Sequence, residues 1–204
     1  MRNLVKLLRK IYDFVERKKI NKNHITIISR DCIGGILYKR LNIRFDSPTI
    51  NLYFNNRDFI VFCENLNEFI NTELKEYKTF NYKYPVGILE NNIGSVKIYF
   101  MHYNDFESAK QAWDKRKLRI HYDNLYIIFD AKHNIDDEIL NRFKNIKCKN
   151  KIILSSNVNV EKYPFAYNMK CYKKECETLI KYPSKYHYKR YLDEVNWKKF
   201  FNNN

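Results

Sequence analysis

The feature that most constrains the fold is a nearly continuous apolar run, Leu-Tyr-Ile-Ile-Phe, which lies between Asn124 and Asp130. A strand that is apolar at successive positions is buried on both faces, as in a parallel sheet covered by helices on either side. Strand and helix patterns alternate with it at 25–30, 57–71, 135–144 and 151–155. The alternation predicts a three-layer α/β fold with helices on both faces of a mostly parallel sheet, made mixed by an antiparallel hairpin at 86–103.

A second informative stretch runs from 25 to 38, where a β-branched strand is followed by a polar turn and then by the start of a helix. The turn contains Cys32 and two adjacent glycines, Gly34 and Gly35, which are half of the glycines in the chain. Loops that connect a strand to a helix bind anions and carry catalytic groups in α/β proteins, because the helix N–H groups point outward there. We therefore predict that this turn is the functional site.

The length of 204 residues fits one domain, 1–204, made of a basic amphipathic helix at 1–20 and a core with a C-terminal helical tail at 21–204. No apolar run reaches the roughly 18 residues of a membrane span. Charged residues recur every few positions near the N-terminus, which argues against a signal peptide. These observations predict a cytoplasmic protein.

Residues 2–19 form the predicted amphipathic helix, with Leu4, Leu8, Ile11 and Val15 at helical spacing. One interpretation is a helix that docks on its own domain. The other is a helix that contacts an anionic membrane surface, which would place the protein peripherally at the inner face of the membrane.

The formal net charge of +15 raises the alternative of nucleic-acid binding. No DNA- or RNA-binding motif accompanies the charge, so we expect no specific nucleic acid as a partner. The five cysteines form no zinc-ligand pattern, and all except Cys32 are interpreted as reduced structural thiols. We predict neither a metal nor a cofactor.

Several segments resemble a bacterial exopolysaccharide-biosynthesis protein family that is numbered 1919 among the domains of unknown function. The resemblance rests on the following motifs: Ile27-Ile28-Ser29 through Cys32-x-Gly34-Gly35, Ser47-Pro48-Thr49, Tyr84-Pro85-Val86-Gly87, Phe100-Met101-His102-Tyr103 with Ala109, Trp113, Arg116 and Arg119, Asp123-Asn124-Leu125, and Arg190 through Trp197. It covers roughly residues 25 to 200 and implies an α/β fold and a role in capsule or exopolysaccharide synthesis. It implies no particular reaction.

Covalent catalysis is the first chemical hypothesis for the turn. Cys32 lies at a predicted helix start, where the helix dipole would stabilise a thiolate. His102, at the end of another predicted strand, is the candidate base, and Asp31 or Asp123 would orient it. The alternative is that Cys32 packs under the turn and His102 is satisfied by a backbone carbonyl.

Phosphate binding is the second hypothesis. The amides of Gly34 and Gly35 would hold a phosphate, with Ser29 or Asp31 at the rim, and the alternative is a tight turn that only packs.

Arg116 and Arg119 lie three residues apart on one predicted helix, and they would clamp a diphosphate. The alternative for this pair is a salt bridge to Asp123. Asn124, from the same block as Asp123, is a further candidate for substrate binding.

Together these arguments predict a transferase of surface-polysaccharide biosynthesis that acts on a sugar, a nucleotide sugar or a lipid-linked substrate. The alternatives are a Cys32-dependent acyl-type transferase and a non-catalytic partner of the polysaccharide machinery.

Overall fold

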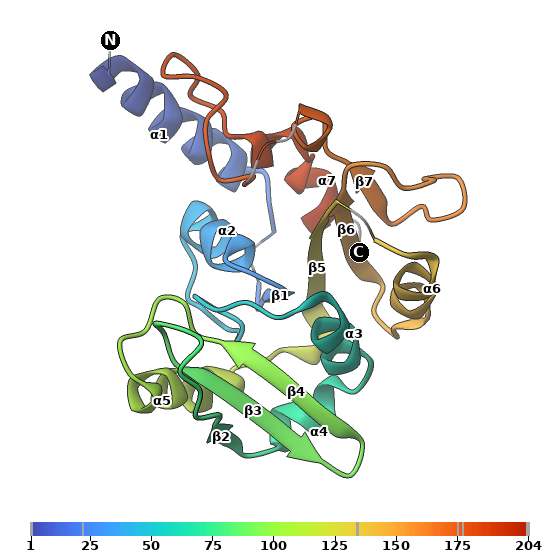
Figure 1. Ribbon diagram of the computed structural model, residues 1–204. Coiled ribbons are helices and arrows are strands. Elements are labelled where there is room, and N and C mark those ends of the chain that lie inside the picture. Colours follow the sequence, from blue (N-terminus) through green and yellow to red (C-terminus); the bar gives the residue numbers. More distant parts are fainter. Residues whose placement is uncertain (1, 22, 134, 175, 177, 203–204) are drawn as a thin grey trace.

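The computed structural model describes residues 2–21, 23–133, 135–174, 176 and 178–202 (Figure 1). Its centre is a parallel sheet of four strands in the order β1 (Thr26–Ser29), β5 (Leu125–Lys132), β6 (Asn150–Ser155) and β7 (Ala166–Asn168). All three neighbouring pairs of this sheet are parallel. The apolar run recognised in the sequence is β5, which lies between β1 and β6 in the sheet.

Alternate side chains of β5 enter two different apolar cores, one on each face of the sheet. Ile127 and Phe129 belong to one core, and Tyr126 and Ile128 to the other. Because strand side chains alternate between faces, a strand of this kind needs an apolar residue at nearly every position. This burial confirms the prediction that the run is covered on both sides.

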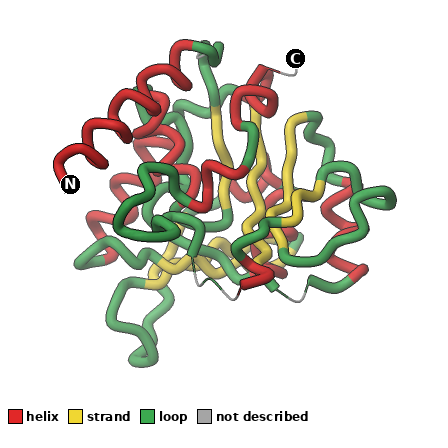
Figure 2. The backbone as a smooth tube through the Cα atoms, turned by 90° about the horizontal axis from the view of Figure 1, so that it is seen from above, coloured by secondary structure: helices red, strands yellow, loops and turns green. Residues whose placement is uncertain are grey.

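Helices cover both faces of the parallel sheet (Figure 2). The helices of the described chain are α1 (Arg2–Lys18), α2 (Ile33–Leu41), α3 (Asn56–Glu64), α4 (Leu66–Asn71), α5 (Phe106–Lys117), α6 (Asp137–Asn145) and α7 (Trp197–Asn202). Residues of α2 and α7 pack in the core that contains Tyr126, whereas residues of α3, α5 and α6 pack in the core that contains Phe129. The predicted α/β class with an N-terminal helix is confirmed.

The antiparallel strands form a sheet of their own, which differs from the single mixed sheet expected from the hairpin. β2 (Leu74–Glu76), β3 (Val86–Asn91) and β4 (Gly94–Tyr99) pair only among themselves within the named strands. A short bridge between Tyr53 and Tyr99 ties this sheet to the segment that precedes α3. The hairpin was predicted from local turn chemistry, which does not determine the strand to which a hairpin pairs.

Helix α1 docks on the domain, but through its polar side. Arg9 of α1 is buried and forms ion pairs with Asp13 and with Asp193 near the C-terminus. The apolar residues Leu4 and Ile11 remain 58% and 50% exposed. A docked amphipathic helix normally buries its apolar face, so this arrangement reverses the usual orientation.

Candidate active site

A pocket of about 530 Å³ lies at the carboxyl edge of the parallel sheet. Its lining comes from the turn between β1 and α2 with the first residue of α2, the segments before α3 and before β3, the turn after β4, the end of β5 and residues 178–180. The lining residues are Arg30, Asp31, Cys32, Ile33, Tyr53, Tyr84, Met101, His102, Asp130, Lys132, Thr178, Leu179 and Ile180. Ligands of open α/β sheets bind outside the carboxyl ends of the strands, so this pocket is at the expected edge.

Cys32 and His102 meet in this pocket, although 70 positions separate them in the sequence. The Cys32 Sγ lies 3.2 Å from the His102 Nε2. Cys32 is the N-cap residue of α2, and His102 is in the turn that follows β4. A thiol and an imidazole at this distance have the geometry of a nucleophile and its base.

Backbone hydrogen bonds explain how the two sheets bring these residues together. The Phe54 N–H donates to the Arg30 carbonyl at 2.9 Å, so the segment before α3 is joined to the end of β1. One position earlier, Tyr53 exchanges two backbone hydrogen bonds with Tyr99 at 2.9 and 3.0 Å. The neighbouring residues Tyr53 and Phe54 therefore hold the end of β4, and with it His102, beside the turn that contains Cys32.

The environment of Cys32 does not favour a resting thiolate, which corrects the expectation from the sequence. Burial and the neighbouring Asp31 carboxylate raise the pKa of Cys32 to about 11. The first amides of α2 are also occupied, since the Ile33 N–H donates to Asp31 Oδ1 at 3.1 Å and the Gly34 N–H to Ser29 Oγ at 3.1 Å. Cys32 is therefore a neutral thiol at rest, and its use as a nucleophile requires a base such as His102.

Asp31 lies in the pocket, but its observed contacts are not with His102. Its carboxylate accepts from the Ile33 amide and lies 3.9 Å from the Arg30 guanidinium. It also faces Asp130, and burial together with the Asp31 charge raises the pKa of Asp130 to about 8. The raised pKa favours the neutral form of the Asp130 carboxyl at pH 7.

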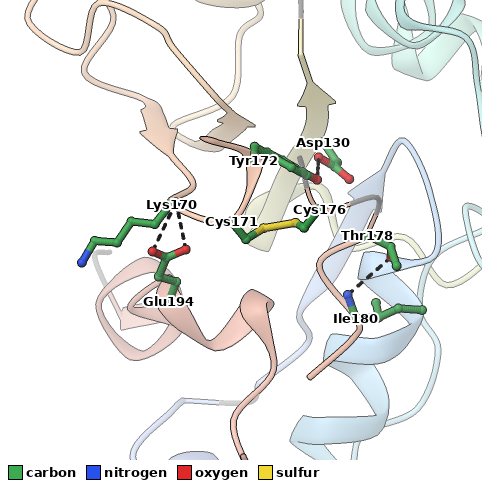
Figure 3. Close-up of a disulfide and its surroundings, with 8 residues drawn as sticks. All are labelled: Asp130, Lys170, Cys171, Tyr172, Cys176, Thr178, Ile180 and Glu194. Carbon is green, nitrogen blue, oxygen red and sulfur yellow. Dashed lines mark hydrogen bonds between the residues drawn. A yellow bond between two sulfur atoms is a disulfide. The ribbon is translucent and has the colours of Figure 1, made fainter. Parts of the chain in front are cut away.

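Asp130 is a site residue that the sequence reasoning missed. It is 3% exposed, and its Oδ1 accepts a hydrogen bond of 2.5 Å from the Tyr172 hydroxyl (Figure 3). Burial raises the pKa of Tyr172, and the charge of Asp130 and the hydrogen bond to it act in the same direction. A signal was present in the sequence, because Asp130 ends the apolar strand at the sheet edge where functional groups gather.

Cys171 and Cys176 form a disulfide beside Tyr172 (Figure 3). This corrects the expectation that both are reduced thiols. Their Cα atoms lie 5.4 Å apart, within the range that a disulfide spans, because the chain turns back after β7. The bond fixes the start of the segment that continues to Thr178, Leu179 and Ile180 on the pocket wall.

Aromatic rings form another wall of the pocket, and the sequence did not predict them as site residues. Tyr53 and Tyr84 line the pocket, with their hydroxyl oxygens 3.5 Å apart. The Tyr53 ring stacks on Tyr99 with a centroid distance of 4.5 Å and an interplanar angle of 15°. Arg30 and Lys132 add positive charge to the same pocket, so it offers both aromatic surface and cations.

Gly34, but not Gly35, is required for close packing. A Cβ atom on Gly34 would lie 2.4 Å from the Ser29 Oγ, so only glycine fits without displacement of that side chain. A Cβ on Gly35 would be in ordinary contact with Ile50. The Gly34 amide already donates a hydrogen bond to the Ser29 hydroxyl, as expected for a turn that only packs. A phosphate site at Gly34 and Gly35 stays a prediction.

Arg116 and Arg119 lie outside the residues that line the pocket. Arg116 donates to the Tyr103 hydroxyl at 2.7 Å and lies over the Phe45 ring. Arg119 donates to the Phe45 carbonyl at 3.4 Å. Neither arginine pairs with Asp123 among the described ion pairs. The two arginines contact Tyr103 and Phe45 instead.

Asp123 and Asn124 lie at the opposite edge of the parallel sheet from Cys32. They belong to the 3₁₀ turn Tyr122–Asn124, directly before the amino end of β5. Asn124 donates to the Asn23 carbonyl, which is also at the amino edge of the sheet. The structure therefore brings together Cys32, His102 and Asp31, but not Asp123 or Asn124.

No group of three or more potential metal ligands occurs within the described residues. In the same part of the chain, no helix is long and apolar enough to cross a membrane.

Comparison with known proteins identifies a family match along nearly the whole chain. Residues 3–202 match the model described as domain of unknown function DUF1919. A relative from Haemophilus influenzae, described as an uncharacterized protein, is 28% identical over 191 residues. The aligned region covers 91% of this chain and 88% of the relative.

Proposed function

This chain belongs to the DUF1919 family, a family of unknown function, and from the geometry of its site we propose that it is a cysteine-dependent group transferase. In the proposal, Cys32 accepts an acyl group and passes it to a hydroxyl of a sugar-containing substrate. The observation that carries the proposal is the distance of 3.2 Å between the Cys32 Sγ and the His102 Nε2 in a pocket at the carboxyl edge of the sheet.

The first proposed step forms a thioester. His102 Nε2 takes the thiol proton as Cys32 Sγ attacks the carbonyl carbon of an acyl donor, which forms the sulfur–carbon bond. The bond to the donor's leaving group then breaks, and the leaving group takes the proton from His102. The raised pKa of Cys32 fits general-base catalysis, because the thiol keeps its proton until the moment of attack.

The second step transfers the acyl group. A sugar hydroxyl attacks the thioester carbon while His102 accepts the hydroxyl proton. The sulfur–carbon bond breaks, and the proton returns to Cys32, so the enzyme is regenerated and one ester has replaced another. No oxidant or reductant is needed.

The walls of the pocket support a sugar-containing acceptor. The rings of Tyr53 and Tyr84 offer apolar faces and hydroxyl groups, which suit the mixed apolar and polar surface of a sugar. Arg30 and Lys132 offer positive charge for the phosphates of a nucleotide sugar or of a lipid carrier. The proposal includes the surface-polysaccharide setting that the family resemblance implies and a location on the cytoplasmic side of the membrane.

Binding would first be tested by thermal shift with nucleotide sugars, acetyl-coenzyme A, lipid-carrier headgroup analogues and short RNA, because a ligand of the folded state raises the melting temperature. Transfer from acetyl-coenzyme A to the sugars that bind would then be measured for the wild type, Cys32→Ser and His102→Gln. Cys148→Ser is the matched control, since Cys148 is a half-buried thiol outside the pocket.

The proposal predicts that Cys32→Ser abolishes transfer, that His102→Gln lowers it at least about 100-fold and that Cys148→Ser leaves it unchanged. Full activity of Cys32→Ser would contradict a covalent intermediate. A shift with short RNA alone would favour nucleic-acid binding instead.

A further inference from the structure

The outer face of α1 is an exposed apolar surface, which we call the α1 stripe. Its six side chains are 38% to 58% exposed and comprise Leu4, Leu7, Leu8, Ile11, Phe14 and Val15. At 100° per residue these positions fall within an arc of about 120°, so they form one continuous strip along the helix. Figure 1 shows α1 at the end of the molecule away from the antiparallel sheet.

The opposite face of α1 is held by a buried charge network, which fixes the stripe toward the outside. Asp193 has a side chain 1% exposed and pairs with both Arg9 of α1 and Arg40 of α2, the second pair at 2.9 Å. Arg40 also lies 3.3 Å from Asp13 of α1. Turning the helix to bury the stripe would separate Arg9 from Asp193 and Asp13 from Arg40, so buried charges would lose partners, at a high energetic cost.

The charges that remain on the outside of α1 are positive. Both acidic residues of the helix, Asp13 and Glu16, face Arg40. Lys10 is exposed beside the stripe, and the Arg17 guanidinium lies 5.0 Å from the ring centroid of Phe14. The Lys18 Nζ lies over the Phe14 ring at 4.3 Å, so a further cation lies on the stripe itself.

We propose that the α1 stripe inserts into the surface of an anionic membrane. Apolar side chains would enter the boundary between headgroups and acyl chains, and the flanking lysines would meet anionic headgroups. A second copy of this chain would suit the stripe less well, because pairing two stripes brings their lysines near one another. The proposal concerns where the protein binds, so it does not depend on the reaction at Cys32.

The direct test is co-sedimentation of the full chain with vesicles. Two compositions would be compared, phosphatidylcholine alone and phosphatidylcholine mixed with phosphatidylglycerol. Leu7→Gln/Ile11→Gln removes two side chains of the stripe, each at an exposed position where the fold does not depend on it. Leu118→Gln/Val160→Gln is the matched control, because those side chains are 83% and 45% exposed and belong neither to α1 nor to the segments that its described ion pairs reach.

The proposal predicts that wild type and control bind the phosphatidylglycerol vesicles and that the stripe variant binds about 100-fold more weakly. Lys10→Gln/Lys18→Gln should bind these vesicles about 25-fold more weakly.

Three results would overturn the proposal. They are absence of wild-type binding, equal binding by the stripe variant, and equal binding to both vesicle types. Self-association in sedimentation velocity that the stripe variant loses, without vesicle binding, would assign the stripe to a second copy of the chain instead.

Discussion

Replacing His102 with glutamine should slow the reaction of Cys32 with a neutral thiol reagent such as iodoacetamide. With a pKa of about 11, Cys32 alone is about 10⁻⁴ thiolate at pH 7, whereas a free cysteine is about 3% thiolate. The thiolate fraction of Cys32 is therefore about 300-fold lower than that of free cysteine. Each thiolate reacts about tenfold faster, because a more basic thiolate is a stronger nucleophile.

Unassisted Cys32 should thus react about 30-fold more slowly than free cysteine at pH 7. A positioned base accelerates such a reaction about 10²-fold or more. Wild type should therefore react with iodoacetamide about 100-fold faster than His102→Gln. The rate for His102→Gln should also rise about tenfold per pH unit from pH 7 to 10, because only the thiolate then reacts. Wild type should show a weaker dependence on pH, since His102 supplies the base at neutral pH.

The assay is quantification of the Cys32 peptide by mass spectrometry after timed exposure to iodoacetamide. His187→Gln serves as the matched control, because His187 is exposed and bonds to Ser184 outside the active-site pocket. Equal rates and equal pH slopes for wild type and His102→Gln would refute the argument that His102 activates Cys32.

Three further predictions concern the residues around the site and α1. Gly34→Ala should lower the free energy of unfolding by about 1–3 kcal/mol in urea titrations, because its Cβ would overlap the Ser29 Oγ, and Gly35→Ala should cost less. The folded-state pKa of Asp130 is raised to about 8, so the folded state binds a proton more tightly than the unfolded state. The free energy of unfolding should therefore fall as the pH rises from about 4 to about 8, by up to about 1.4 kcal/mol per pH unit. Asp130→Asn should lessen that fall, whereas Asp123→Asn, at an exposed site, should not; a wild-type stability that rises over this range would contradict the assignment. Asp193→Ala should cost about 3–5 kcal/mol, because it removes the buried carboxylate that Arg9 and Arg40 share and leaves them only the partly exposed carboxylates of α1. A loss below about 1 kcal/mol would show that the network does not hold α1.

Much of the fold was predictable because local patterns there agree with the tertiary structure. The run ending at Asp130 is apolar at successive positions, and it is the strand covered on both faces. Sheet membership was not predictable, because the hairpin at β3 and β4 joins the rest of the molecule through a bridge at Tyr53 that no local pattern marks. The orientation of α1 was not predictable either, since it depends on ion pairs with Asp193 near the other end of the chain.

The site was partly predictable for the same physical reason. Cys32 and His102 both follow the ends of predicted strands, and the structure places the Cys32 Sγ 3.2 Å from the His102 Nε2. Asp123 and Asn124 come before a strand instead of after one, so they lie at the amino edge of β5. The raised pKa of Cys32 could not be read from the sequence, because it arises from burial and from the position of the Asp31 carboxylate.

The central claim is that Cys32 carries an acyl group during the reaction. The most direct measurement is acid-quenching of the protein during reaction with an activated ester such as p-nitrophenyl acetate, followed by peptide mapping by mass spectrometry. The account predicts one acetyl group on the Cys32 peptide, absent in Cys32→Ser and formed much more slowly in His102→Gln. An acetyl group found on other residues alone, or the same labelling in His102→Gln as in wild type, would contradict it.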